Sequence, residues 1–168
     1  MSTLPSLLKS NYRVRFTECD PFGHLNNSRY VDYMLNARED HLRDGYALLL
    51  SDFLKQGIYW VVSGHEIQYK RPAIYNEVVC IVSALIEAGE QHLRVESQMW
   101  NETQTELKAV LWTRFTVVDA KTGRKSGHPE EFMAFARSVL YNEAVIEEGL
   151  SARVQALLQG VAGETIKP

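Results

Sequence analysis

The chain has 168 residues, of which 45% are hydrophobic and 23% are charged. This composition is ordinary for a globular protein, and the length fits one domain with a real core. A formal net charge of -3 argues against a nucleic-acid-binding protein, which usually carries a basic stripe. No apolar run approaches the roughly 20 residues that a transmembrane helix needs, and the first 16 residues lack the pattern of a signal peptide.

Two cysteines, Cys19 and Cys80, form neither a disulfide framework nor a CxxC metal pair. No two His, Cys or carboxylate residues show the spacing of metal ligands on one predicted element. We therefore expect no metal ion and no cofactor. The default expectation is a cytoplasmic protein that binds neither nucleic acid nor a membrane.

The first predicted strand covers residues 12–17, where apolar residues alternate with arginines. Pro21 and Gly23 end it. A long helix follows, and the side chain of Asn26, Asn27 or Ser28 is expected to cap its first turn. Apolar residues recur at steps of three and four along one face of this helix. The helix is expected to fray beyond Gly45 into the leucines at 48–50. The residues predicted on this face are Tyr30, Tyr33, Met34, Ala37, His41, Leu42 and Gly45.

Four strands are predicted after the helix, over residues 58–70, 77–87, 92–100 and 107–118. Gly64 is expected to place a bulge in the first of them. His92 and Arg94, on the polar side of the third, are expected at the surface. Because short turns separate consecutive strands, we expect antiparallel hairpins.

A helical tail is predicted to begin after Pro129 and to break near Gly149. The tail packs on the edge of the sheet or mediates higher assembly, and the sequence leaves both open. The expected fold class is α+β, an antiparallel sheet wrapped around one long helix. We expect a single domain over residues 1–168, with a core at about 10–128 and the tail at about 129–168.

The segment between the first strand and the helix concentrates reactive groups. Asp20 offers a carboxylate that can act as a base or a nucleophile, and His24 can exchange a proton near neutral pH. Backbone N–H groups at 23–27 lie at a helix start, which favours an oxyanion such as that of a thioester under attack. The same residues also fit a simple turn and helix cap, and composition alone favours that interpretation.

Residues 16–34 read FTECDPFGHLNNSRYVDYM and are followed by Ala37-Arg38-Glu39. This pattern closely resembles the 4-hydroxybenzoyl-CoA thioesterase-like branch of the hotdog superfamily. The YKRPA run at 69–73 is similar to a second, weaker motif of that family. The resemblance implies a five-stranded hotdog sheet around the helix, and activity as an acyl-CoA thioesterase.

The resemblance also implies a homodimer or homotetramer, with the sheets joined in a dimer and the active sites at the dimer interface. It assigns catalysis to Asp20, with His24 as a partner whose role stays open. Plant acyl-ACP thioesterases have an asparagine where Phe22 stands, so this site is not a close copy of theirs. The residues expected to bind the oxyanion or the substrate are Gly23, Asn26, Asn27 and Tyr30, with Asn26 and Asn27 mainly structural.

Basic pairs beside turns are candidate contacts for the phosphates of coenzyme A, namely Lys70, Arg71, Arg124 and Lys125. Candidates for a second catalytic group are His65, Glu66, Glu77 and His92, although polar residues on strands usually face solvent. Two other functions remain open: an acyl-thioester hydratase of the same fold, and a non-catalytic subunit that binds acyl thioesters. The aromatic residues Phe22, Tyr30, Tyr33 and Trp60 line a substrate entrance or belong to the core, so the acyl group is not determined.

Overall fold

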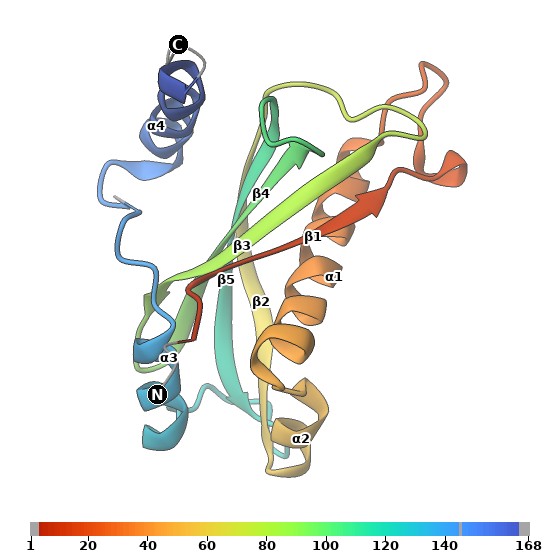
Figure 1. Ribbon diagram of the computed structural model, residues 1–168. Helices are drawn as coiled ribbons and strands as arrows, with labels where there is room; N and C mark the ends of the chain where they lie inside the picture. The colour runs from red at the N-terminus through yellow and green to blue at the C-terminus, as the bar shows by residue number, and fades with distance from the viewer. Residues whose placement is uncertain (1–3, 145, 165–168) are drawn as a thin grey trace.

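The computed structural model describes residues 4–144 and 146–164. Five antiparallel strands form one sheet, with a long helix against one face and a shorter C-terminal helix against the other (Figure 1). This is the predicted α+β hotdog arrangement. Residue 145 and residues 165–168 of the predicted tail lie outside the described residues. No helix in the described part of the chain is long and apolar enough to cross a membrane.

The sheet has the strand order β1-β3-β4-β5-β2. Its strands are β1 (Leu7–Arg13), β2 (Ile58–Tyr69), β3 (Val78–Ala88), β4 (His92–Asn101) and β5 (Leu107–Asp119). The hairpins β3–β4 and β4–β5 are antiparallel, as predicted. Pairing shifts between Val62 and Gly64 confirm the bulge predicted in β2.

The expectation of a hairpin between β2 and β3 is wrong, because β2 pairs with β5 at the opposite edge of the sheet from β1. The connecting residues 70–77 do not turn back on themselves. They are held against the loop before the long helix, where Leu25 N–H donates to Ala73 O at 2.8 Å and Tyr75 N–H donates to Gly23 O at 2.8 Å. These bonds hold the connecting residues beside the start of the long helix.

The first strand lies earlier than predicted. β1 pairs with β3 over Leu7–Arg13, and residues 16–18 form a 3-10 turn. Val14 is buried, but Phe16 is 76% exposed rather than on an inner face. The reason is that the backbone of Val14 bonds to Asn76 and Glu77, after which the chain leaves the sheet edge.

Helix α1 (Asn27–Tyr46) packs on the inner face of the sheet and buries the predicted residues from Tyr30 to His41. Leu42 and Gly45 are only half-buried, and Arg38, which the pattern did not predict, is buried. Asn26 precedes the helix, but its side chain makes no capping bond, so the predicted side-chain cap is not formed. Instead of fraying, the chain turns at Ala47 and forms a second helix, α2 (Leu50–Lys55).

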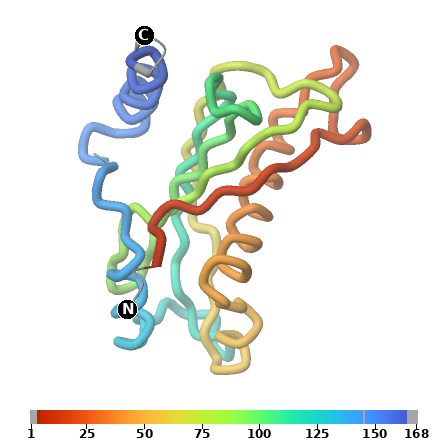
Figure 2. The backbone as a smooth tube through the Cα atoms, viewed as in Figure 1, coloured from red at the N-terminus to blue at the C-terminus, as the bar shows by residue number. Residues whose placement is uncertain are grey.

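Two more helices follow the sheet, α3 (Glu130–Ser138) after Pro129 and α4 (Gly149–Glu164). Helix α4 lies on the side of the strands opposite α1 (Figure 2). Leu150 and Val154 of α4 pack with Trp100 and Trp112 of the sheet. The tail therefore covers the outer face of its own sheet rather than the sheet edge.

The same tail buries polar groups on β4. Arg153 of α4 forms an ion pair with Glu96 at 2.9 Å, and Glu96 is only 1% exposed. His92 and Arg94 on this face are half-buried rather than fully at the surface, and both pair with Glu87.

Candidate active site

The loop before α1 closes around the side chain of Asp20. Its Oδ1 accepts the backbone N–H groups of Phe22 at 2.9 Å and His24 at 3.0 Å. The loop can tighten in this way because Gly23 adopts a positive φ of 75°, which costs glycine little. Oδ2 has no hydrogen-bond partner among the described residues, so one oxygen holds the loop and the other stays available.

Most backbone N–H groups around the helix start are already used within the protein. Those of Gly23, Leu25 and Asn26 donate to Asp20 O, Ala73 O and Glu18 O, respectively. In the described part of the chain, the N–H groups of Asn27 and Ser28 donate to no acceptor. The oxyanion donors expected over 23–27 are therefore reduced to Asn27 and its neighbour.

Asp20 faces a small cavity of about 220 Å³ between the helix start and the end of β2. Four residues predicted from the loop and helix start line it, Asp20, His24, Asn27 and Tyr30, together with the basic pair Lys70 and Arg71 predicted as contacts for CoA phosphates. Gly23 and Asn26, also predicted as site residues, do not; they shape the loop and the helix start. Leu25, Tyr69 and Pro72 complete the lining.

Tyr30 combines a buried ring with a polar group at the cavity. Its hydroxyl oxygen accepts the Ala73 N–H at 2.8 Å, and its ring meets Tyr69 edge-on at 5.1 Å between ring centroids. Burial raises the pKa of Tyr30, so the phenol keeps its proton. No described acceptor takes that proton, which leaves the O–H free to donate to a ligand.

The wall opposite Asp20 is formed by the end of β2. Tyr69 O–H donates to Asn27 O at 2.9 Å and thereby fixes β2 to the helix start. Lys70 and Arg71 donate their backbone N–H groups to Lys108 O, at 2.7 and 3.2 Å, while their side chains are exposed and make no ion pair with a described residue.

Lys108 supports this wall, although no sequence pattern predicts this role. It is 5% exposed, pairs with Glu77 at 2.9 Å and Glu106 at 2.5 Å, and donates to Pro72 O at 3.1 Å. Burial by itself lowers the pKa of Lys108, but the two carboxylates together raise it above its ordinary value. A lysine on an alternating strand reads as a solvated residue, so only the three-dimensional arrangement reveals its role.

The other candidates do not line this cavity. Arg124 and Lys125 lie in the turn between β5 and α3, far from the start of α1 in Figure 1. Glu77 is engaged by Lys108, His92 pairs with Glu87, and His65 contacts Thr113. Glu66 is exposed on β2. Within the described residues, no three His, Cys, Asp or Glu side chains are grouped so as to hold a metal ion.

Comparison with known proteins identifies the family of the chain. Residues 14–136 match the family described as the thioesterase-like superfamily. The long-chain acyl-CoA thioesterase FadM of Escherichia coli (strain K12) is 26% identical over 117 residues, which cover 68% of this chain and 86% of FadM.

Solved structures share the fold. A DHNA-CoA thioesterase from Staphylococcus aureus matches with a TM-score of 0.70 at 19% identity, over 92% of this chain and 94% of that one. A 1,4-dihydroxy-2-naphthoyl-CoA thioesterase from Synechocystis matches with a TM-score of 0.70 at 14% identity, over 78% and 96% of the two chains. Because the family match spans most of the sequence and includes the Asp20 loop, the chain belongs to the thioesterase-like superfamily.

Proposed function

We propose that this protein is an acyl-CoA thioesterase that converts an acyl-CoA and water into a carboxylic acid and free CoA. The observation that carries the proposal is the carboxylate of Asp20, fixed through Oδ1 at the start of α1 and available through Oδ2. The same cavity is lined by Tyr30 and Asn27. The phenol proton of Tyr30 and the amide N–H of Asn27 have no acceptor among the described residues.

In the proposed reaction, the thioester carbonyl carbon lies next to Asp20. Asp20 either takes a proton from a water molecule, whose oxygen attacks the carbon, or attacks the carbon itself and forms an anhydride that water then opens. In both routes the carbonyl oxygen becomes an oxyanion, and the C–S bond breaks with the electron pair leaving on the CoA sulfur. The thiolate is then protonated.

Asn27 N–H and Tyr30 O–H are the proposed oxyanion donors. A preorganised donor at such a position lowers the barrier because it meets the charge as it develops. His24 also lines the cavity, and its ring makes no hydrogen bond with a described residue. We assign it to positioning of water or substrate.

Lys70 and Arg71 are the proposed contacts for the CoA phosphates. They stand at the edge of the same cavity with exposed cationic side chains, and a cation beside a thioester site suits the phosphates of its carrier. This places the CoA outside the cavity and the thioester inside it.

We further propose that two copies pair through β2. This strand has 12 residues, forms one edge of the sheet, and exposes Tyr59, Val62 and Tyr69. An unpaired edge of this length is a template for another strand. Because β2 ends in the cavity wall, a partner strand along it would lie directly beside the site.

The proposed function is tested by incubating the protein with a panel of aliphatic and aromatic acyl-CoAs and measuring released thiol. Release from at least one member supports hydrolysis. Tight binding without release would instead identify a non-catalytic acyl-thioester-binding subunit. A single turnover in ¹⁸O-labelled water is followed by mass spectrometry of the protein. Label on Asp20 identifies direct attack with opening of the anhydride at the protein carbonyl, because general-base attack of water places label only in the released acid.

A further inference from the structure

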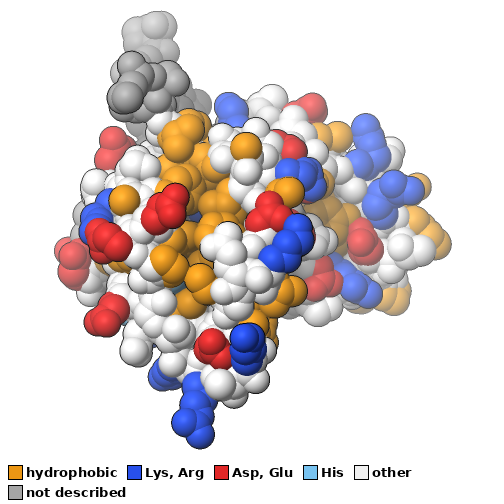
Figure 3. Space-filling view, turned by 90° about the horizontal axis from the view of Figure 1, so that it is seen from below, with side chains coloured by type: hydrophobic (Ala, Val, Ile, Leu, Met, Phe, Trp, Pro, Cys, Tyr) orange, Lys and Arg blue, Asp and Glu red, His pale blue; other side chains and the backbone are white. Residues whose placement is uncertain are grey.

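A second, larger cavity lies at the other end of α1. It has a volume of about 410 Å³ and is enclosed by the second half of α1, α2, the start of β2 and α3. Figure 3 views the molecule from this end and shows hydrophobic side chains gathered in its surface. The two cavities share no lining residue. On α1 the two linings come nearest at Tyr30 and Leu35, about 7.5 Å apart along the helix at the usual rise.

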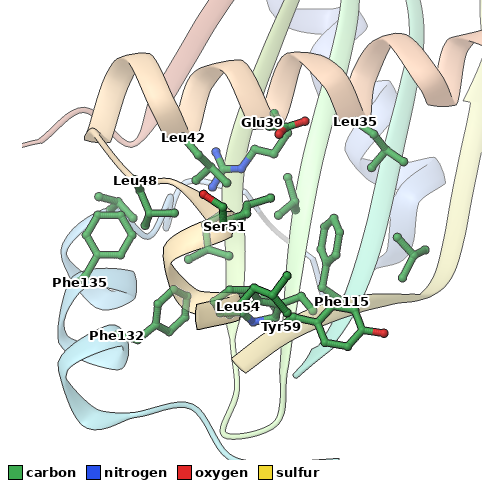
Figure 4. A pocket seen from close by; sticks show the side chains of 18 of the residues that line it. Leu35, Glu39, Leu42, Leu48, Ser51, Leu54, Tyr59, Phe115, Phe132 and Phe135 are labelled. Atoms are coloured by element: carbon green, nitrogen blue, oxygen red, sulfur yellow. The ribbon is translucent and has the colours of Figure 1, made fainter. Parts of the chain in front are cut away.

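The walls of this cavity are mainly apolar. Figure 4 shows the side chains of Leu42, Leu48 and Leu54 and the rings of Phe115, Phe132 and Phe135 around the cavity. Such a lining suits an apolar body, since each buried methylene contributes about 0.8 kcal/mol. The polar side chains of the lining, such as those of Asn36, Glu39 and Ser51, are exposed, with one exception that is buried.

The exception is Arg38, which lines the cavity and is only 8% exposed. Its Nη1 donates to Ser83 Oγ at 3.2 Å. No carboxylate among the described residues forms an ion pair with it. A buried guanidinium stays charged in proteins, and a buried charge without an opposite charge is costly.

A chain of oriented hydrogen bonds holds Ser83 beneath Arg38. Ser10 O–H donates to Tyr12, and Tyr12 O–H donates to Asp40, at 3.0 and 2.7 Å. Ser10 therefore accepts from His41 Nε2 at 2.8 Å, which leaves His41 Nδ1 to accept from Ser83, also at 2.8 Å. The oxygen of Ser83 is thus directed toward Arg38.

Two partners inside the protein engage the guanidinium of Arg38. Ser83 accepts one N–H, and the Tyr46 hydroxyl oxygen accepts another, so that at most three of the five N–H donors are left for a ligand. The bond to Tyr46 raises the pKa of Arg38, against the larger effect of burial, which lowers it. The remaining positive charge lies in the wall of an apolar space.

We propose that this cavity binds a carboxylate carried on an apolar body, with the carboxylate against Arg38 and the hydrocarbon among the leucine and phenylalanine side chains. Two sources present this chemistry: a free fatty acid, and an acyl thioester whose far end is a carboxylate. Both sources relate to the proposed thioesterase function, because a free fatty acid is a product of that reaction and the thioester is a substrate. Binding of the free acid can nevertheless be measured without turnover, whereas the second source rests on the proposed function.

Glu39 is the one carboxylate in the lining, and its position agrees with the proposal. It is exposed, whereas Arg38 is buried, so its negative charge is solvated at the mouth of the cavity. Glu39 is therefore a matched control, adjacent in sequence, in the same cavity and opposite in charge.

The test compares decanoate with decanol by isothermal titration calorimetry, using the full chain. We expect the wild type to bind decanoate roughly ten- to hundredfold more tightly than decanol, because a charged hydrogen bond is added. Arg38→Met should bind both equally, and Glu39→Gln should keep or increase the preference. Equal binding by the wild type, or an undiminished preference in Arg38→Met, would overturn the proposal.

A second variant covers the case that Arg38→Met does not fold. Ser51 is exposed on α2 and lines the cavity, so Ser51→Trp fills the space without disturbing the core. It should abolish binding of both probes. Wild-type affinity for decanoate in this variant would show that the cavity is not the site.

The two sources are separated by turnover. If a thioester carboxylate is the ligand, Arg38→Met lowers kcat/KM roughly tenfold for an ω-carboxyacyl-CoA and leaves the methyl-ended acyl-CoA of equal length unchanged. If a free fatty acid is the ligand, the variant treats both thioesters alike while decanoate binding still depends on Arg38. Absence of all turnover would contradict the proposed function and leave the calorimetric result standing.

Discussion

At the scale of single residues, Tyr30 links the fold to the proposed chemistry. Its hydroxyl accepts the Ala73 N–H and keeps its own proton for the cavity. We expect Tyr30→Phe to lower kcat roughly hundredfold with little change in KM, as loss of an oxyanion donor does. Tyr69→Phe, which loses only the bond to Asn27 O, is the control. A folded Tyr30→Phe protein with unchanged kcat would exclude this role.

His41 gives the protein a predictable response to acid. Burial, and then the charge of Arg38, lower the pKa of His41 from 6.5 to about 4. The unfolded chain therefore binds a proton before the folded one does. Above pH 6.5 His41 is neutral in both states and the free energy of unfolding is at its full value. As the pH falls toward 4, the free energy of unfolding decreases by up to about 3 kcal/mol.

Urea unfolding across this pH range measures the effect. His41→Gln cannot titrate, and its stability should fall less steeply than that of the wild type. The pKa values of His65 and His128 are also lowered by burial and remain in both proteins, so the difference between the two curves reports His41. Parallel curves would contradict the assigned pKa.

The sequence could predict the Asp20 side of the site because its residues are contiguous and the loop between strand and helix brings them together. It also offered two basic pairs as contacts for CoA phosphates, of which only Lys70 and Arg71 line the cavity. It could not predict Arg38 or Lys108 as buried. A cation on an amphipathic element normally reaches solvent, and whether it does depends on what other segments cover it.

At the scale of elements, the helix and the hairpins follow from hydrophobic period and turn length. The placement of β2 at the far edge does not, because it depends on bonds between residues 70–77 and the loop before α1. Helix α2 was not predicted, because a helix of six residues is too short to show a recognisable hydrophobic period. The position of the C-terminal helices could not be predicted, because an apolar helix face does not show which surface it packs against.

Docking of α4 leads to a stability prediction. Glu96 lies beneath the helix and accepts bonds from Arg153, Gln98 and Trp112. Removing the cation leaves the buried carboxylate of Glu96 without an opposite charge, so Arg153→Ala should destabilise the fold by about 3–5 kcal/mol. Combining Glu96→Gln with Arg153→Met should recover most of that loss in urea unfolding. Equal losses in both variants would show that the charge pair is not the cause.

At the scale of the whole molecule, the open edge of β2 predicts assembly. We expect light scattering to give twice the chain mass. Specific activity should fall on dilution in step with dissociation, because the partner strand would lie beside the cavity that Tyr69 helps to form. A monomer with full activity would contradict pairing through β2 as part of the site.

The central claim, that Asp20 drives thioester hydrolysis, is tested most directly by thiol release from the acyl-CoA panel with wild type and Asp20→Asn. The amide keeps an oxygen for the N–H groups of Phe22 and His24, so the loop should persist. We predict hydrolysis by the wild type and a loss of at least roughly hundredfold in kcat in the variant, with unchanged thermal stability. Full hydrolysis by Asp20→Asn would contradict the account.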